Sequence, residues 1–346
     1  MLSLLCCPQT GRKFRPVIRF EGGKPPVNDI PLFGGIEAGG TKIVCASGTG
    51  PEDMNRAQFP SGSAPDAALA PVIRWLRCEE ERRGRFRALG IGSFGPVGLD
   101  PHSPSYGRIT TTPKEGWRNA DILGTFRRAF PGIPIGFDTD VNAAAMGEHR
   151  WGAGRSLGDF VYITMGTGIG AGVMAGGKLL HGLVHPEAGH LRIPRLPGDA
   201  FPGICPFHGD CWEGLCSGPA ILKRTGIPAE DLPGNHEAWP LTARYTAIAL
   251  ADLVCALSPR RIILGGSVPR AGLLGRDRFL AMVRNGVREA LGGYISVPEL
   301  SGDLSGYIIP PLLEENAGIC GALALAETAW EEARHPTDSR NDVSSR

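Results

Sequence analysis

A strand followed by a glycine-rich turn and a second strand occurs twice in this 346-residue chain. The first unit spans Gly35–Lys42 and the second Met165–Gly172, about 130 residues later. Two such hairpins, each of a size to hold a phosphate, predict a duplicated α/β fold with two similar halves and a cleft between them. Two unrelated hairpins are the simpler alternative, and it stays open at this point.

The amino-acid composition limits the kinds of molecule that this chain is expected to bind. Fifty glycines suit a chain with many tight turns and close backbone approaches to a ligand. The formal net charge of +1 provides no global field for nucleic acid or an acidic membrane, so we expect neither partner. We also expect no membrane span, since no apolar run approaches the ~20 residues that one needs. The odd number of cysteines, nine, favours a reducing compartment, and we expect a cytoplasmic protein.

The hydrophobic pattern divides the chain into four parts. Residues 1–30 show no helical or strand period and are predicted to be a poorly ordered extension. Residues 31–140 are predicted to form a smaller N-terminal lobe with the first glycine turn, and residues 141–330 a larger lobe with the second. Residues 331–346 are predicted to be a frayed tail. The predicted helices are Ala64–Cys78, Asp121–Phe130, Asn142–Trp151, Tyr245–Leu257 and Gly318–Trp330.

The glycine turns have the chemistry of phosphate sites. Gly39 and Gly40 let backbone N–H groups approach phosphate oxygens, and Thr41 adds a hydroxyl. Glu37, just before them, could hold Mg²⁺ through water. No helix follows the second turn, which disfavours a dinucleotide site of the Rossmann type, and no loop has the Walker pattern.

Asp140 lies where a predicted strand ends and a helix begins. A plain helix cap is the structural alternative for an aspartate in this position. Transfer of a phosphoryl group to a hydroxyl, however, needs a carboxylate that accepts the proton of the attacking group. Because two phosphate-type turns accompany it, we expect Asp140 to be the catalytic base.

A compact group of thiols and imidazoles predicts a metal site. Cys205, His208 and Cys211 form a Cys-x2-His-x2-Cys loop, and His190 lies upstream as a fourth ligand. Two cysteines and two histidines complete a closed tetrahedral Zn²⁺ site. Other candidates for the fourth ligand are Cys216, His185 and His181.

Three segments could contact a polar substrate. Glu187 precedes His190 by three residues, and both could face sugar hydroxyls while zinc fixes the loop. Gly95 and Trp117 lie in two further loops marked by glycine and aromatic residues. Trp117 could pack on a sugar face, or it could serve in the core or in a lid.

Together and in this order, the motifs from about residue 33 to residue 326 resemble those of the ROK (repressor, open reading frame, kinase) family. Glu37 stands where the family has an aspartate before its glycines, and Thr139 stands where an asparagine usually precedes the catalytic aspartate. Glu187-Ala188-Gly189-His190 looks like the family's sugar-binding motif. The resemblance implies sugar contacts from Gly95, Trp117, Asn142, Glu187 and His190. It implies nucleotide contacts from Gly39, Gly40, Thr41, Lys42, Gly166, Thr167, Gly168, Gly170, Pro219, Gly265 and Gly266.

The resemblance also implies a fold and a reaction. The fold is the duplicated actin-like ATPase fold (ribonuclease H-like), with two lobes around a central cleft. The zinc loop, with histidine where most of the family has a third cysteine, resembles that of bacterial fructokinases. We therefore expect ATP-dependent phosphorylation of D-fructose at its 6-hydroxyl, with Mg²⁺ accompanying ATP, a structural Zn²⁺, and a homodimer.

Three alternatives remain. Mannose, glucose or an N-acetylhexosamine could be the substrate in place of fructose. The repressor branch of the family would need a DNA-binding module, and residues 1–30 contain no pair of amphipathic helices. A non-catalytic sugar sensor would have no reason to keep Asp140.

Overall fold

The computed structural model describes residues 30–335 of the chain. The expectations for the N-terminal extension up to residue 29, and for the tail after residue 335, lie outside the described residues. Helix α9 runs to Arg334, so the beginning of the expected frayed tail is helical.

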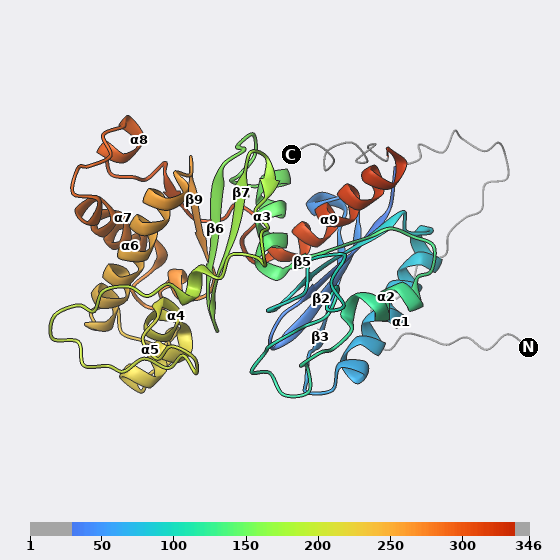
Figure 1. The fold of residues 1–346 in the computed structure, drawn as a ribbon, viewed down its shortest axis with the longest axis horizontal. Coiled ribbons are helices and arrows are strands. Elements are labelled where there is room, and N and C mark those ends of the chain that lie inside the picture. The colour runs from blue at the N-terminus through green and yellow to red at the C-terminus, as the bar shows by residue number, and fades with distance from the viewer. Residues whose placement is uncertain (1–29, 336–346) are drawn as a thin grey trace, which may run out of the picture. The chain divides into compact units, whose positions relative to one another are not determined.

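Two five-stranded sheets form the framework (Figure 1). In the first sheet the order is β3-β2-β1-β4-β5, and in the second it is β10-β9-β6-β7-β8. The strands of the first sheet are β1 Phe33–Ala38, β2 Lys42–Gly48, β3 Asn55–Pro60, β4 Ala88–Ser93 and β5 Ile135–Thr139. Those of the second are β6 Phe160–Met165, β7 Ile169–Ala175, β8 Lys178–Leu179, β9 Ile262–Gly265 and β10 Ile308–Ile309.

The two sheets have one topology. In each, an antiparallel hairpin, β1–β2 or β6–β7, is extended on one side by a third antiparallel strand. On its other side, the first strand of each hairpin pairs in parallel with a strand that arrives after a crossover, and a fifth strand follows in parallel. Parallel neighbours need such long connections, and each of those here contains at least one helix. The predicted duplication is confirmed, and two unrelated hairpins are excluded.

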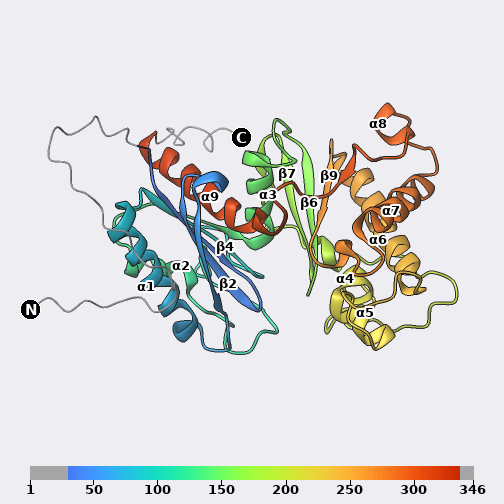
Figure 2. The same cartoon turned by 180° about the vertical axis from the view of Figure 1, so that it is seen from behind.

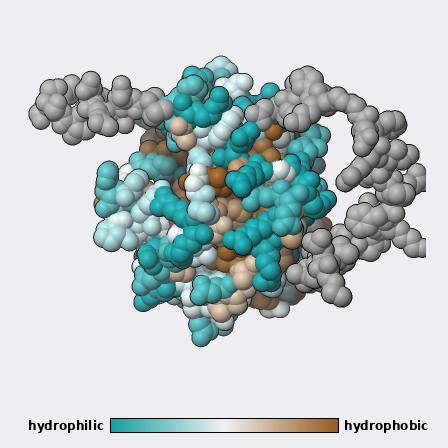
Figure 3. Space-filling view, turned by 90° about the vertical axis from the view of Figure 1, so that its right-hand side faces the viewer, coloured by the Kyte–Doolittle hydropathy of each residue, from teal (hydrophilic) through white to brown (hydrophobic). Residues whose placement is uncertain are grey.

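Helices α1 (Pro65–Arg83) and α2 (Ile122–Ala129) pack against the first sheet. The inward face of α1 carries Leu69, Val72 and Leu76, spaced at three and four residues, as an amphipathic helix requires. Burial of each such side chain contributes about 1.5–3 kcal/mol to folding. Figure 3 views the molecule from this end: hydrophilic side chains cover most of the face, and the apolar groups between them lie deeper.

Helices α3 (Asp140–Trp151) and α9 (Ala317–Arg334) pack against each other between the two sheets (Figures 1 and 2). Their axes approach closely because glycine lies at the crossing: a Cβ on Gly321 would come 1.6 Å from the carbonyl oxygen of Ala143. Helix α9 also packs on β1 and β4, so the C-terminal helix returns to the first sheet. The lobe boundary at residue 140 stays a prediction, but the first lobe includes this C-terminal helix.

The second lobe is built around α6 (Ala238–Leu257) and α7 (Arg276–Leu291). Helix α6 is long and apolar enough to cross a membrane by length and composition, so the expectation that no segment reaches that length was wrong. Its side chains, Trp239 and Tyr245 among them, are buried in the core of the lobe, which accounts for its apolar character.

Several elements differ from the prediction. Helix α6 begins at Ala238, seven residues before the predicted start at Tyr245, and α1 extends to Arg83. Elements that the sequence pattern had not predicted are α4 (Trp212–Cys216), α5 (Gly218–Thr225), α7 (Arg276–Leu291) and α8 (Pro298–Ser301), with strands β8 and β10.

Candidate active site

The first glycine turn joins β1 to β2. The N–H of Gly39 donates to the carbonyl of Lys42 over 2.9 Å, which closes the turn and leaves Gly40, Thr41 and Lys42 exposed. The ammonium of Lys114 bonds the Gly40 carbonyl, and its own loop is thereby fixed to this turn. The turn is therefore open to solvent, and its role in holding phosphate stays a prediction.

Glu37 lies one residue before the end of β1. A Cβ on Gly318 would come 2.5 Å from its carboxyl group, so the carboxyl group lies directly against the first turn of α9. Burial, and then the charge of Asp140, raises the pKa of Glu37 to about 7. This carboxylate and that of Asp140 therefore affect each other.

The second glycine turn joins β6 to β7. The N–H of Gly166 donates to the carbonyl of Gly168 over 2.8 Å, and the carbonyl of Gly166 accepts from Gly218 at the start of α5. The carboxylate of Glu213 accepts from the N–H of Ile169 over 2.8 Å, beside the turn. Thr167 is exposed at the tip of the turn, and Gly170 follows on β7.

The predicted adenosine residues adjoin this second turn. Gly265 ends β9, and Gly266 follows at φ +99°, a conformation that favours glycine. A Cβ on Gly266 would come 2.2 Å from the carbonyl oxygen of Met165. Pro219 is exposed in the first turn of α5. Gly265 and Gly266 line a small pocket whose other residues are Leu264, Pro269, Arg270, Arg276, Pro311 and Glu314.

Asp140 is the first residue of α3, and it is not the helix cap. Thr139 is the cap, since its hydroxyl accepts from the N–H of Asn142 over 3.0 Å. The structural alternative for Asp140 is therefore wrong. One oxygen of the Asp140 carboxylate accepts from the N–H of Val141 over 2.8 Å. Burial raises the pKa of this carboxyl to about 6, which makes it a stronger base than an ordinary aspartate.

A hydrogen-bonded network lies beside the base. Asp138 is buried, and its two oxygens accept from the amide of Asn142 over 2.6 Å and from Nε2 of His181 over 2.8 Å. The bond to Asp138 raises the pKa of His181. Asn142 is fully buried, and its amide oxygen has no hydrogen-bond partner among the described residues. Sequence reasoning missed Asp138 and considered His181 only as a metal ligand.

Trp117 and Gly95, the two loop residues predicted to contact a sugar, lie in different surroundings. Trp117 has no exposed surface, and its indole N–H donates to the carbonyl of Gly62 over 2.9 Å. The ring of Phe94 packs edge-on against it at 5.3 Å. Trp117 thus lies in the core, which was the alternative to a sugar contact. Gly95 lies beside the ring of His185.

Glu187 lies just before the short helix η2 (Ala188–His190). Partial burial, and then the carboxylates of Glu213 and Asp140, raise its pKa to about 7. The carboxyl groups of Glu187 and Asp140 therefore influence each other's protonation.

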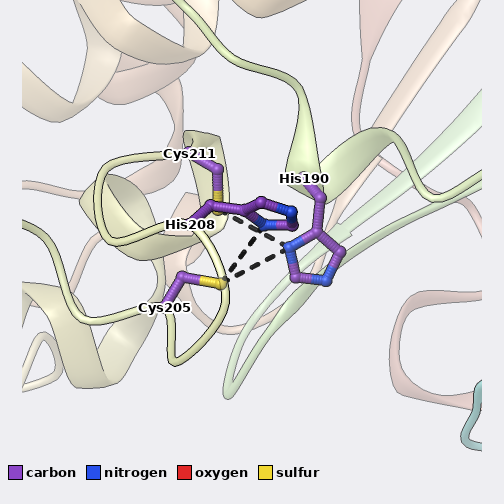
Figure 4. A group of neighbouring side chains, drawn as sticks. All are labelled: His190, Cys205, His208 and Cys211. Carbon is purple, nitrogen blue, oxygen red and sulfur yellow. Dashed lines mark hydrogen bonds between the residues drawn. The ribbon is translucent and has the colours of Figure 1, made fainter. Parts of the chain in front are cut away.

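The predicted metal ligands come together (Figure 4). The ligand atoms of His190, Cys205, His208 and Cys211 all lie within 4.8 Å of one another. Nδ1 of His190 is 3.7 Å from the sulfur of Cys205 and 3.5 Å from that of Cys211, and Nδ1 of His208 is 3.6 Å from the sulfur of Cys205.

These distances fit a tetrahedral zinc ion. Bonds of about 2.3 Å to sulfur and about 2.0 Å to nitrogen give sulfur–nitrogen edges of about 3.5 Å at a tetrahedral angle. Of the alternative fourth ligands, Cys216 lies in the core with its thiol toward the carbonyl of Thr242. The geometry favours His190.

The comparisons with known proteins agree with this geometry. The model of the "ROK family" matches residues 33–329. The chain belongs to the ROK family. Among its relatives is a protein named fructokinase from Pediococcus pentosaceus, 41% identical over 87% of this chain and 100% of its own length. Another protein of that name, from Zymomonas mobilis, is 40% identical over 87% of this chain and 98% of its own length.

The solved structures agree as well. A ROK family glucokinase from Streptomyces griseus, in complex with glucose and AMPPNP, superposes with a TM-score of 0.66 at 25% identity. The alignment covers 86% of this chain and 99% of that one. The actin-like ATPase fold predicted for this ROK protein is confirmed, with one sheet of the duplicated pair in each lobe.

Proposed function

We propose that this ROK protein is an ATP-dependent fructokinase. The observation that carries the proposal is the position of Asp140, a carboxylate of raised pKa at the start of α3, among Glu37, Asp138 and Glu187. The relatives named fructokinase, which align over nearly their whole length, support the choice of sugar.

In the proposed reaction, the Asp140 carboxylate accepts the proton of the sugar 6-hydroxyl while that oxygen attacks the γ-phosphorus of ATP. The bond from the γ-phosphorus to the bridging oxygen breaks, and ADP leaves. The backbone N–H groups of the exposed residues Gly40 and Thr167 would bind phosphate oxygens, and Gly265 and Gly266 would border the adenosine. Mg²⁺ bound with ATP would neutralise the charge of the phosphates, and Glu37 would hold this ion through a water molecule.

We propose that Glu187, His190 and Asn142 contact the sugar. Zn²⁺ bound by the Cys/His group would fix the segment that presents Glu187 and His190. The seven cysteines among the described residues are all free, which supports a reducing, cytoplasmic location. A homodimer also remains a proposal, drawn from the family resemblance.

A coupled assay of ADP release over a panel of hexoses tests the choice of sugar. We expect fructose to have the highest kcat/KM and mannose to come second. The buried hydroxyl of Thr139 already accepts from the N–H of Asn142, so it has only its hydrogen to offer, whereas the asparagine usual in the family offers a donor and an acceptor. A sugar that needs both contacts should therefore lose about five- to a hundredfold. A panel in which glucose or N-acetylmannosamine exceeds fructose would contradict the proposal.

A further inference from the structure

His185 is a buried histidine that neither the metal group nor the proposed reaction uses. Its side chain is only 5% exposed, and it lies two residues before Glu187. A Cβ on Gly95 would lie 3.7 Å from its Nε2, so the ring edge with this atom faces the Gly95 loop. The inference that follows rests on the proposed sugar-kinase function and deepens it.

The hydrogen position on the ring follows from its neighbours. Nδ1 lies 3.4 Å from a carboxylate oxygen of Glu187. The ionised carboxylate of Glu187 accepts from Nδ1–H, and in that state Nε2 is left as an acceptor. Burial lowers the pKa of His185, which keeps the ring neutral and this acceptor available.

Nε2 of His185 is buried and has no hydrogen-bond partner among the described residues. The amide oxygen of Asn142 is in the same condition. Its assignment as oxygen is fixed by Asp138, because a carboxylate accepts from the amide nitrogen, here over 2.6 Å. Gly95, beside the His185 ring, follows the end of β4 at Ser93, which pairs with Thr139 at the end of β5, and the hydroxyl of Thr139 accepts from the N–H of Asn142. Both acceptors therefore lie at the same end of these two strands.

Two unpaired acceptors in one buried place are unusual, because an unsatisfied buried polar atom is destabilising. A ligand that offers several hydroxyl donors would satisfy both. A hexose has this chemistry, and Gly95, Asn142 and Glu187 already mark the neighbourhood as the proposed sugar site.

We propose that Nε2 of His185 and the amide oxygen of Asn142 accept hydrogen bonds from hydroxyl groups of the bound hexose, and that His185 is a specificity-determining residue of this kinase.

Three substitutions at one position test the role of Nε2. In His185→Gln the side-chain amide reaches the position of Nε2, whereas in His185→Asn it reaches only that of Nδ1. His185→Phe keeps a ring without either nitrogen. We expect KM for fructose to rise about tenfold or more in the Asn and Phe variants and to stay within about threefold of wild type in the Gln variant. KM for ATP and the zinc content should not change.

Two results would overturn the inference. One is a wild-type KM for the sugar in all three variants. The other is an equal rise of KM in all three, Gln included, together with a lower thermal midpoint, which would assign His185 a packing role. The wild-type hexose panel separates this test from the proposed function: if another hexose is preferred, the fructose proposal fails and the same comparison is made with that sugar. If no hexose is phosphorylated, hexose binding to the same variants, measured by calorimetry, decides the role of His185.

Discussion

Asp140 differs from an ordinary surface aspartate in its position and in its acidity. It occupies the first turn of α3 without capping the helix, because Thr139 performs that task. The helix cap therefore does not depend on the carboxyl group of Asp140, and this group can change its protonation state without loss of the cap. Its raised pKa, about 6, still leaves most of the group ionised at neutral pH.

Asp140→Ala should lower kcat by about 10²-fold or more while the protein remains folded, as expected for loss of a general base. In the wild-type protein, kcat/KM should fall as the pH drops below about 6, because the protonated carboxyl group cannot accept a proton. Steady-state kinetics over pH measure both effects. Asp66→Ala, an exposed aspartate on α1, is the control and should behave as wild type. Normal turnover by folded Asp140→Ala would exclude the assignment.

At the scale of elements, the segment that contains Cys205, His208 and Cys211 connects η2 to α4. Cys205 and Gly209 exchange backbone hydrogen bonds, and Gly209 has φ +67°, so the chain folds back on itself between the two cysteines. Cys211 is the N-cap of α4, and His190 ends η2, beside β7. A metal ion here would join the loop to the segment that carries Glu187.

Metal analysis of the native protein should find about one zinc per chain. Cys211→Ser should lose it, with a lower thermal midpoint and weaker sugar binding, because metal binding is coupled to folding of the loop. Cys255→Ser, an exposed free thiol on α6, is the matched control and should keep the metal. Native protein that is fully active without metal would contradict the site. Loss of zinc in Cys216→Ser, with retention in His190→Ala, would show that the fourth ligand is wrong.

The helices and strands also show how much of the secondary structure could be predicted from the sequence alone. Helices α2, α3 and α9 were predicted within a few residues. Helix α7 was missed, although Phe279, Val283, Val287 and Leu291 repeat every four residues and are the signal that identifies it. Strands β8 and β10 have two residues each and no period of their own, so only their sheet neighbours define them.

In the candidate site, too, local sequence motifs could be predicted, whereas contacts between distant segments could not. The four metal-ligand candidates form a local motif, and the sequence predicted their grouping. The packing of Trp117, the network of Asp138 with His181 and the unpaired nitrogen of His185 depend on contacts between distant segments. No local pattern reports such contacts, so these features needed the structure.

At the scale of the whole described chain, duplication explains why the site lies where it does. Each sheet contributes one glycine turn from the same hairpin of the same topology. Helices α3 and α9 lie between the sheets, and the base begins one of them while Glu37 lies against the start of the other. Motion of one lobe relative to the other would therefore act directly on the distance between the phosphate turns and the base.

The most direct test of the account is the identity of the product. Wild-type protein is given ATP, Mg²⁺ and fructose, and two signals are followed: ADP release, and NADPH formed through phosphoglucose isomerase and glucose-6-phosphate dehydrogenase, which respond only if fructose 6-phosphate appears. We predict equal rates for the two signals, and loss of both in Asp140→Ala. ADP release without NADPH would place the phosphoryl group elsewhere or on water, and absence of both signals from the folded, zinc-containing wild-type protein would contradict the proposed fructokinase function.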